Sequence, residues 1–269
     1  MQTLSPVDEA RMLADRAGVE VRRILSPADC RTGGAVLADV WRTPNESPPL
    51  TPETLRALSH VGAYVYGVWD RTDGLVGVSV GFLTGGPTIA LHSHVTGVLS
   101  SHRRRGLGLV LKQHQRAWAL AQGIDTIGWT CDPLVRRNMM FNLARLGAAV
   151  QDYVPDFYGA MTDGVNAGDS SDRAELTWTL RTPRSGLTEA ADAVPAIRLD
   201  RGAPVPVDPG TARRVLVATP EDIEALRSTD RAAAKAWRLA VREALVSRLA
   251  AGWQVRGITA GGDYVVEAP

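Results

Sequence analysis

The sequence predicts an α/β (α+β) protein, because helix-period and strand-period patterns of apolar residues alternate over its first two thirds. Two β-rich runs, 63–69 and 75–83, are separated by Asp70-Arg-Thr-Asp-Gly74, which is the spacing of a hairpin. A second hydrophobic pattern follows a proline-rich stretch. We therefore expect a main domain of helices and strands and a smaller α+β extension at the C-terminus.

Helix starts and stops in the first half are marked by proline and glycine. Pro27 and Thr51-Pro52 are typical of first turns, and Gly123 is a natural C-cap. The expected elements, in order, are a helix over 7–17, a strand over 19–25, helices over 27–42 and from 51, strands over 63–69, 75–83 and 89–99, and a helix over 106–123.

The second half continues the alternation and then breaks at a run of prolines. Its expected elements are a strand over 124–130, a helix over 136–146, strands over 148–154, 175–180 and 215–219, a long helix carrying Trp237, and strands over 253–259 and 263–267. The segment 182–212 holds five prolines, which favours a linker. We expect domain boundaries at 1–181, 182–212 (the linker) and 213–269, the last packed on the first because it is too short for a large core of its own.

Composition narrows the function classes. Thirty basic residues stand against 29 acidic ones, a balance that disfavours an electrostatic nucleic-acid binder. No apolar run approaches a membrane span, and no signal peptide is visible at the N-terminus. The two cysteines, Cys30 and Cys131, cannot form a zinc site alone and are expected to be reduced. We expect a cytoplasmic protein without a metal, a nucleic-acid partner or a membrane partner.

The most informative segment is Val98–Val110, where a strand ends, a basic glycine-containing turn follows and a helix begins. Such a turn can direct backbone N–H groups and the positive end of the helix at a phosphate. The segment lacks the Gly-x-x-x-x-Gly-Lys-Ser/Thr pattern of a Walker loop. It also lacks the third glycine of a dinucleotide fingerprint, since Leu111 occupies that position.

The pattern Arg103-Arg-Arg-Gly106-Leu-Gly108 resembles the acyl-CoA pyrophosphate loop of the GNAT (GCN5-related N-acetyltransferase) superfamily. The order of expected elements over 19–180 is similar to that superfamily as well, which implies a mixed, mostly antiparallel central sheet flanked by helices. A subgroup of predicted acetyltransferases with a C-terminal extension is more similar still. The residues shared with it are Ser93-His94, Gly97-Val98, Gly123–Asp125, Trp129, Asp132–Leu134, Asn138, Phe141–Leu143, Leu146–Ala148, Phe157–Gly159, Pro220, Asp222 and Trp237-Arg238.

The resemblance implies an acyl-CoA-dependent N-acyltransferase that moves an acetyl or succinyl group to the amine of a small molecule such as an amino acid, in a ternary complex. It implies acetyl-CoA or another acyl-CoA as donor, bound by Val98, Leu99, Arg103, Arg104, Arg105, Gly106, Leu107, Gly108 and Asn138. Three alternatives stay open: a GNAT-fold protein that binds acyl-CoA without catalysis, a protein or peptide N-acetyltransferase, and nucleic-acid binding through the arginines. A homodimer is one option for its oligomeric state.

Three residues are candidates for catalysis. Strand alternation predicts that His94 shares a face with Val98, beside the expected thioester position, and an imidazole suits a general base near neutrality. A substrate contact and a purely structural histidine are the alternatives for His94. Asp132 is a candidate base, amine anchor or helix cap. The superfamily's helix tyrosine, its general acid, is replaced here by Leu143, so Tyr158 is a candidate acid and the alternative is that no residue fills this role.

Candidate acceptor-binding residues lie in two places. Trp41 and Glu46 stand at the end of the second helix and in the loop after it, which shapes the acceptor pocket in the superfamily. Arg238 could clamp a carboxylate, because a guanidinium binds carboxylates through two parallel hydrogen bonds. The alternative for the Arg238 helix is core packing through its neighbour Trp237.

Overall fold

The computed structural model describes residues 4–45, 47–86, 88–161, 163–165, 168–181 and 186–269. The chain divides into two compact units, Met1–Gly128 and Trp129–Pro269. The acyltransferase domain expected over 1–181 spans the first unit and part of the second, and this domain division stays a prediction.

Three helices of the first unit begin at a capping side chain followed directly by proline. Ser5, Ser26 and Thr51 each accept a hydrogen bond from a backbone N–H of the first turn, which satisfies a donor that has no partner within the helix. The helices are α1 (Pro6–Ala17), α2 (Pro27–Trp41) and α3 (Pro52–His60). The three predicted helices are thereby confirmed.

An antiparallel meander forms the sheet of this unit. Strands β1 (Glu20–Arg23), β2 (Tyr64–Trp69), β3 (Leu75–Leu83) and β4 (Leu91–Val98) pair in that order. The carboxylate of Asp70 accepts the Thr72 and Gly74 N–H groups and so shapes the turn between β2 and β3. The last strand to join is β5 (Thr126–Cys131), which runs parallel to β4 and pairs with it at Leu91↔Ile127 and His92↔Gly128.

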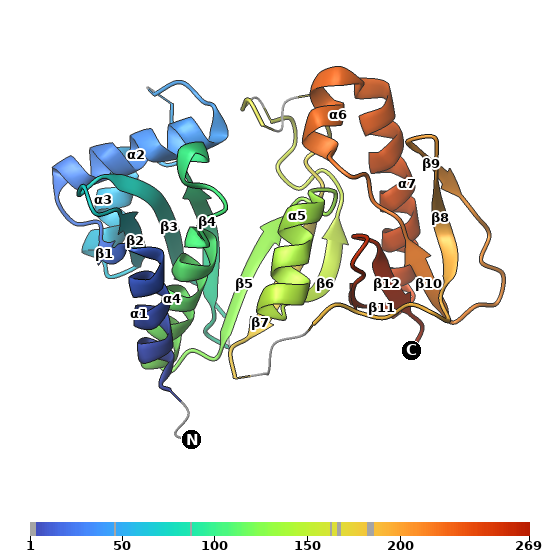
Figure 1. Cartoon of the computed structure of the whole chain (residues 1–269), viewed down its shortest axis with the longest axis horizontal. Coiled ribbons are helices and arrows are strands. Elements are labelled where there is room, and N and C mark those ends of the chain that lie inside the picture. The colour runs from blue at the N-terminus through green and yellow to red at the C-terminus, as the bar shows by residue number, and fades with distance from the viewer. Residues whose placement is uncertain (1–3, 46, 87, 162, 166–167, 182–185) are drawn as a thin grey trace. The chain divides into compact units, whose positions relative to one another are not determined.

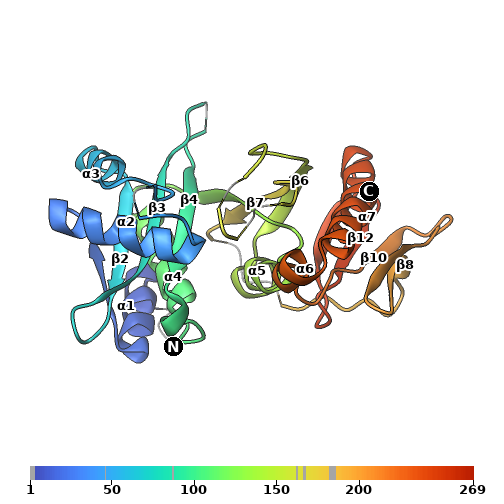
Figure 2. The same cartoon turned by 90° about the horizontal axis from the view of Figure 1, so that it is seen from above.

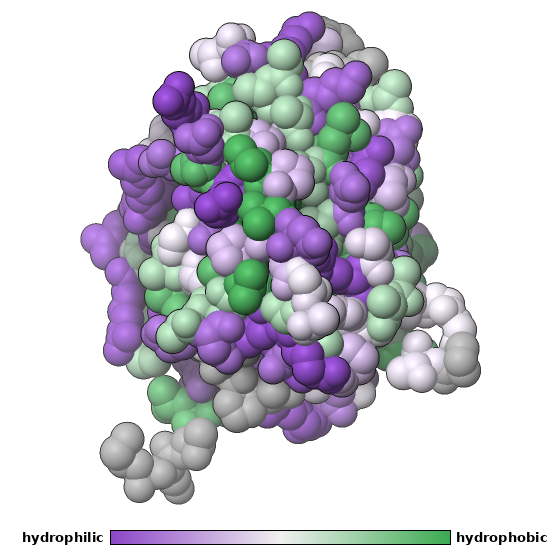
Figure 3. All heavy atoms as spheres, turned by 90° about the vertical axis from the view of Figure 1, so that its right-hand side faces the viewer, coloured by the Kyte–Doolittle hydropathy of each residue, from purple (hydrophilic) through white to green (hydrophobic). Residues whose placement is uncertain are grey.

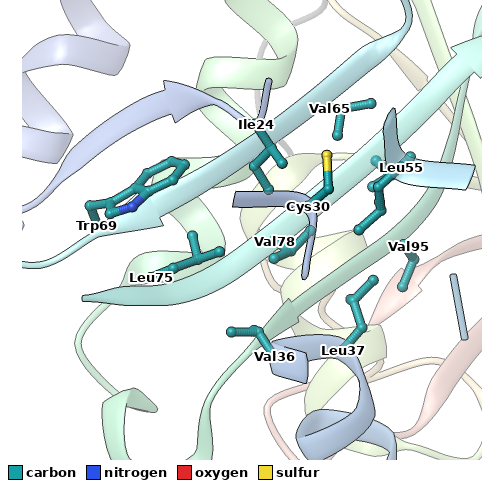
Figure 4. Close-up of a cluster of buried hydrophobic side chains, with 11 residues drawn as sticks. Ile24, Cys30, Val36, Leu37, Leu55, Val65, Trp69, Leu75, Val78 and Val95 are labelled. Atoms are coloured by element: carbon teal, nitrogen blue, oxygen red, sulfur yellow. The ribbon is translucent and has the colours of Figure 1, made fainter. Parts of the chain in front are cut away.

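Helices cover both faces of this sheet (Figure 2). On one face α2 and α3 bury Leu37 and Leu55 against the strands, in the cluster drawn in Figure 4. On the other face α4 (Leu107–Ala121) buries Leu107 and Leu111 against Val68 and Val76. Each face thus holds its own apolar core, and the loop from β4 to α4 crosses from the sheet to one of the covering helices.

The strands of the second unit belong to two sheets (Figure 1). In the first, β7 (Arg173–Thr179) and β6 (Ala149–Val154) follow β5 at the end of the strand order β1-β2-β3-β4-β5-β7-β6. Between β5 and β6 lie α5 (Arg136–Met139) and π-helical turns over Met140–Leu146, which end at Gly147 with a left-handed φ of 78°. The predicted helix over 136–146 is therefore present, with a wider hydrogen-bonding pattern in its second half.

The second sheet belongs to the C-terminal extension. Its order is β11-β12-β10-β8-β9, formed by β8 (Val194–Asp200), β9 (Ala203–Pro206), β10 (Arg214–Val217), β11 (Gln254–Ile258) and β12 (Tyr264–Glu267). Helices α6 (Ile223–Thr229) and α7 (Arg231–Ala250) precede β11, and α7 buries Trp237, Val241 and Leu245. On the side viewed in Figure 3, hydrophobic residues are interspersed with hydrophilic ones.

Two strands, β8 and β9, lie within the segment predicted as a linker, so that part of the prediction is corrected. Pro204 and Pro206 are tolerated because β9, on which they lie, is an edge strand. The Val207 N–H donates to the Ala196 carbonyl, so by alternation the positions of Pro204 and Pro206 face away from β8, where no donor is required. The mixed, mostly antiparallel arrangement of strands with flanking helices confirms the predicted fold class. Among the described residues, no helix combines the length and the apolar character needed to cross a membrane.

Candidate functional site

The turn that follows β4 is tied to the sheet at its beginning. The Leu99 N–H donates to the Val76 carbonyl at 2.9 Å, and a short 3-10 helix, Ser100–His102, comes next. The His102 imidazole lies 3.5 Å from the Asp70 carboxylate. Hydrogen bonds from Thr72 and Gly74, with a smaller contribution from His102, lower the pKa of Asp70 and keep it charged. These contacts therefore fix the start of the turn relative to β3 and to the Asp70 turn.

Three consecutive arginines occupy the exposed part of the turn. Arg103, Arg104 and Arg105 are all exposed, and none takes part in the ion pairs found among the described residues. Arg104 has a φ of 65°, which is uncommon for a residue with a side chain. Their charges are thus directed to solvent, where they create a local positive field.

The N-terminus of α4 supplies backbone donors beside these arginines. Its N-cap is Gly106, with a φ of 76° and no capping side chain, so the first N–H groups of the helix stay open to an outside acceptor. A Cβ at Gly106 or Gly108 would meet nothing within 4 Å. Because the helix N-terminus carries a partial positive charge, uncapped N–H groups, bare glycine backbone and three arginines together make a cradle that fits a phosphate group.

Strand β4 contains a bulge at His94, which corrects one prediction. Val80 pairs with Val95 and Gly81 with Ser93, so His94 is the extra residue and the alternation shifts there. The His94 ring lies with Phe82 and His92, whereas Val98 packs with the α4 core on the other face of the sheet. His94 and Val98 therefore do not share a face as simple alternation predicted.

The rings at the bulge form a small aromatic cluster. The centroid of the Phe82 ring lies 5.2 Å from that of His92 and 5.5 Å from that of His94. Desolvation lowers the pKa of both histidines from 6.5, and in His92 the nearby His94 and Lys112 lower it further. Both imidazoles are therefore neutral at pH 7, the state that a general base requires.

Trp41 is brought against the same strand. The Trp41 ring closes over Gly97 so tightly that a Cβ at Gly97 would lie 2.7 Å from it. The end of α2 thus contacts β4 one residue before Val98. Glu46, the second acceptor-binding candidate of this region, lies outside the described residues.

Asp132 and Arg238 lie in the second unit, inside a buried cluster of charges. Both Asp132 oxygens accept hydrogen bonds from Arg238, each at 2.9 Å, and Arg227 also donates to Asp132. The Asp169 carboxylate accepts from the same two arginines, at 3.0 Å from Arg227 and 2.8 Å from Arg238. The Arg238 side chain is 1% exposed, so its donors are turned inward.

This geometry argues against two predicted roles. Burial alone would raise the pKa of Asp132, but Arg238 and Arg227 lower it to about 2, which makes the carboxylate a very weak base. The N–H donors of the Arg238 guanidinium are already bonded to two internal carboxylates, so they cannot bind a substrate carboxylate in this arrangement. Asp132 instead accepts the Leu134 N–H at 2.9 Å, in the turn that precedes α5. The N-cap of α5 is Val135, with no capping side chain, so Asp132 does not cap this helix, whereas the fully buried Trp237 matches the core-packing alternative.

The remaining candidates are dispersed over the second unit. Asn138 lies exposed on α5, while Leu143 is buried in the π-helical turns. Tyr158 is 46% exposed in the loop after β6, and its hydroxyl lies 3.3 Å from the Thr130 hydroxyl of β5. The structure thus joins Trp41, the end of β4 and the arginine turn in one unit, and Asp132 with Arg238 in the other.

Sequence reasoning missed the partners of the buried cluster. Asp169 and Asp172 come from the segment between β6 and β7, and Arg227 and Arg242 come from the extension. Arg238 and Arg242 lie one helical turn apart on α7, next in sequence to the buried Trp237 and Val241, and this spacing is the signal that could have indicated an internal role. No group of three or more potential metal ligands occurs among the described residues.

Comparisons with known proteins give similarity of structure only. No protein-family model matches the chain, and no curated protein matches it. A GNAT-family acetyltransferase from Streptococcus pneumoniae is similar over 59% of this chain and 98% of its own, with 13% identity and a TM-score of 0.49. The ribosomal-protein-S5-alanine acetyltransferase from Vibrio fischeri is similar over 62% and 96%, with 17% identity and a TM-score of 0.48.

A third similar structure is Naa20 from Chaetomium thermophilum in complex with a bisubstrate analogue. It is similar over 60% of this chain and 86% of its own, with 20% identity and a TM-score of 0.47. With identities below 25% and TM-scores below 0.5, these similarities add no argument about chemistry, which rests on the residues of the chain itself.

Proposed function

We propose that this protein is an acyl-CoA-dependent N-acyltransferase of the GNAT type, acting on the amine of a small molecule such as an amino acid. The observation that carries the proposal is the phosphate cradle at the start of α4: the uncapped helix, the open glycines Gly106 and Gly108, and the exposed Arg103–Arg105 directly after β4. Of the phosphate ligands considered, acyl-CoA is the one whose loop pattern this turn resembles.

The edge of β4 supports the rest of the donor site. The described pairing with β5 is only two residues long, at Leu91 and His92, while the bulge at His94 belongs to the pairing of β4 with β3. Where the pairing of a strand ends, its backbone polar groups can bind an extended ligand arm as they would bind another strand. An N–H of this segment would polarise the thioester carbonyl, as in an oxyanion hole.

The transfer requires little covalent chemistry from the chain. The acceptor nitrogen attacks the thioester carbonyl carbon, a C–N bond forms, the C–S bond breaks, and the thiolate departs with the electron pair. The amine must give up a proton, and the neutral His94 imidazole on the bulge is the residue that we assign to accept it, directly or through water. Thiolate departure needs no dedicated acid, since a thiol has a pKa of about 8.5.

Tyr158 and Asn138 keep their predicted roles as proposals. The Tyr158 phenol is exposed beside Thr130 and is available to an acceptor or to a leaving thiolate. Asn138 is exposed on α5, and its proposed role is a contact with the donor. Trp41, packed on Gly97, is proposed as a wall of the acceptor pocket.

The decisive experiment measures binding and turnover together. Isothermal titration is expected to show acetyl-CoA or succinyl-CoA binding. We then expect a thiol-release screen of those donors against D- and L-amino acids, polyamines and short peptides to find one donor and one acceptor whose reaction rate saturates with concentration. Absence of acyl-CoA binding overturns the proposal. Binding without thiol release with any acceptor identifies a non-catalytic acyl-CoA-binding protein. Thiol release with peptides alone identifies a protein or peptide N-acetyltransferase.

A further inference from the structure

An exposed aromatic turn follows β6. The turn contains Phe157 and Tyr158, which are 41% and 46% exposed, and their rings meet edge to face with centroids 4.6 Å apart. The Arg173 guanidinium lies over the Tyr158 ring, 5.1 Å from its centroid. The turn therefore presents two aromatic rings, one of them with a hydroxyl group, to solvent in fixed positions.

The backbone of the turn is fastened to the residues that precede β7. The Tyr158 N–H donates to the Ser171 hydroxyl at 2.9 Å, and the Phe157 N–H donates to the Ser171 carbonyl at 3.2 Å. The Asp156 N–H donates to the Asp172 carboxylate at 3.0 Å. Three successive backbone N–H groups of the turn are thus hydrogen-bonded to two residues, Ser171 and Asp172.

Asp172 is in turn held by the C-terminal extension. Arg242 on α7 donates to both of its oxygens, from Nε at 2.9 Å and from a terminal nitrogen at 2.7 Å. The Tyr153 hydroxyl donates to it at 2.5 Å. The Asp172 side chain is fully buried, and burial would raise its pKa, but these hydrogen bonds lower the pKa and keep the carboxylate charged.

We propose that Arg242 is a positioning residue for Tyr158: through Asp172 and Ser171 the C-terminal extension fixes the aromatic turn that contacts the acceptor. This inference rests on the proposed function for the part that concerns the acceptor. Arg242 touches no reacting atom in this scheme. Its two-pronged bond, together with the Tyr153 hydroxyl, holds the carboxylate in the orientation that accepts the Asp156 N–H, and we expect its loss to loosen the start of the turn.

Arg242 suits a test because its side chain is 28% exposed, unlike the fully buried Arg238. Chymotrypsin cleaves after aromatic residues only where the backbone is loose enough to enter its active site. We expect Arg242→Gln to be cut after Phe157 or Tyr158 at least tenfold faster than the wild-type protein, under conditions in which both are folded by circular dichroism. Arg242→Lys, which keeps the charge and one hydrogen bond, is expected to be cleaved at a rate between those of the wild-type protein and Arg242→Gln.

Two further variants separate positioning from general loss of stability. Lys235→Gln changes an exposed cation on the same helix and is expected to leave cleavage unchanged. Ser171→Ala removes the hydroxyl that holds the Tyr158 N–H and is expected to accelerate cleavage as well, so the proposal stays testable should Arg242→Gln fail to fold. Wild-type cleavage rates in both Arg242→Lys and Ser171→Ala overturn the proposal.

Kinetics test the link to the acceptor. In Arg242→Gln we expect the acceptor KM to rise at least fivefold or kcat to fall at least fivefold, while the acyl-CoA Kd stays within twofold of wild type. Tyr158→Ala is expected to change the acceptor KM or kcat in the same way and to leave the acyl-CoA Kd unchanged. The double variant is expected to show acceptor kinetics little different from those of either single variant. Faster cleavage with unchanged acceptor kinetics refutes the link. A wild-type protein that transfers no acyl group refutes the proposed function, while the cleavage assay still decides whether Arg242 positions the turn.

Discussion

Arg238 and Asp132 form a two-pronged ion pair inside the second unit, with both N···O distances at 2.9 Å. Asp132 follows β5, and Arg238 lies on α7, more than a hundred residues later in the chain. The pair, completed by Arg227 and Asp169, ties the C-terminal extension to the end of β5 through buried charges of opposite sign. Its value to the fold can be measured directly.

Removing one partner of this pair should be costly. Arg238→Leu leaves two buried carboxylates with Arg227 as their remaining partner, and a buried charge that loses its counter-charge costs about 3–5 kcal/mol. We expect the free energy of unfolding to fall by that amount in urea titrations. Lys235→Leu, an exposed cation one helical turn earlier on α7, is the matched control and should change it little. A loss below 1 kcal/mol for Arg238→Leu would contradict the role that we assign to the pair.

The same cluster predicts how stability depends on pH. The folded-state pKa of Asp132 is about 2, below its ordinary 3.8, so its contribution is complete above about pH 4 and is lost as the pH falls towards 2. We expect the stability gap between wild type and Asp132→Asn to narrow by about 2 kcal/mol between pH 6 and pH 2. The measurement is urea unfolding at both pH values. An equal gap at the two would show that Asp132 is not held charged by the arginines.

The phosphate cradle should respond to a reversed charge. We expect Arg103→Glu and Gly108→Asp each to raise the acyl-CoA Kd at least tenfold while the protein stays folded, because Arg103 is exposed and a Cβ at Gly108 meets open space. Arg31→Glu, an exposed arginine on α2, controls for the change of net charge. Isothermal titration supplies the Kd values. Unchanged binding in both test variants would refute the assignment of the cradle.

The His94 assignment makes a prediction about rate and pH together. His94→Gln is expected to lower kcat by about 10²-fold, the usual effect of losing a general base. Because the folded-state pKa of His94 lies below 6.5, the wild-type rate should rise with pH below that value and be level by about pH 7. His92→Gln, on the same strand and in the same ring cluster, is the comparison. A loss under threefold for His94→Gln would assign His94 a structural role.

Much of the fold could be predicted from local patterns. Proline after a capping residue marks α1, α2 and α3, and the alternation of apolar residues marks the strands of the first unit. The strands β8 and β9 could not be predicted, because proline lowers the strand signal wherever it occurs. Only the pairing shows that Pro204 and Pro206 occupy edge positions that need no donor.

The site was predictable where one segment carries it. The arginine turn, Gly106 and Gly108 are contiguous, so their chemistry is visible in the sequence. The bulge at His94 has no local signature, because it arises from how β4 registers against β3, and strict alternation therefore placed His94 on the wrong face. The partners of Asp132 and Arg238 lie tens of residues away, which no spacing rule reaches.

The prolines of β9 also decide what the outer edge of the second sheet can do. An exposed edge strand normally offers a row of N–H groups on which another chain can assemble, which is a common origin of aggregation. On β9 two of the outward positions are Pro204 and Pro206, which have no N–H to offer. This edge therefore ends the sheet, and it protects the protein at high concentration from strand-to-strand association.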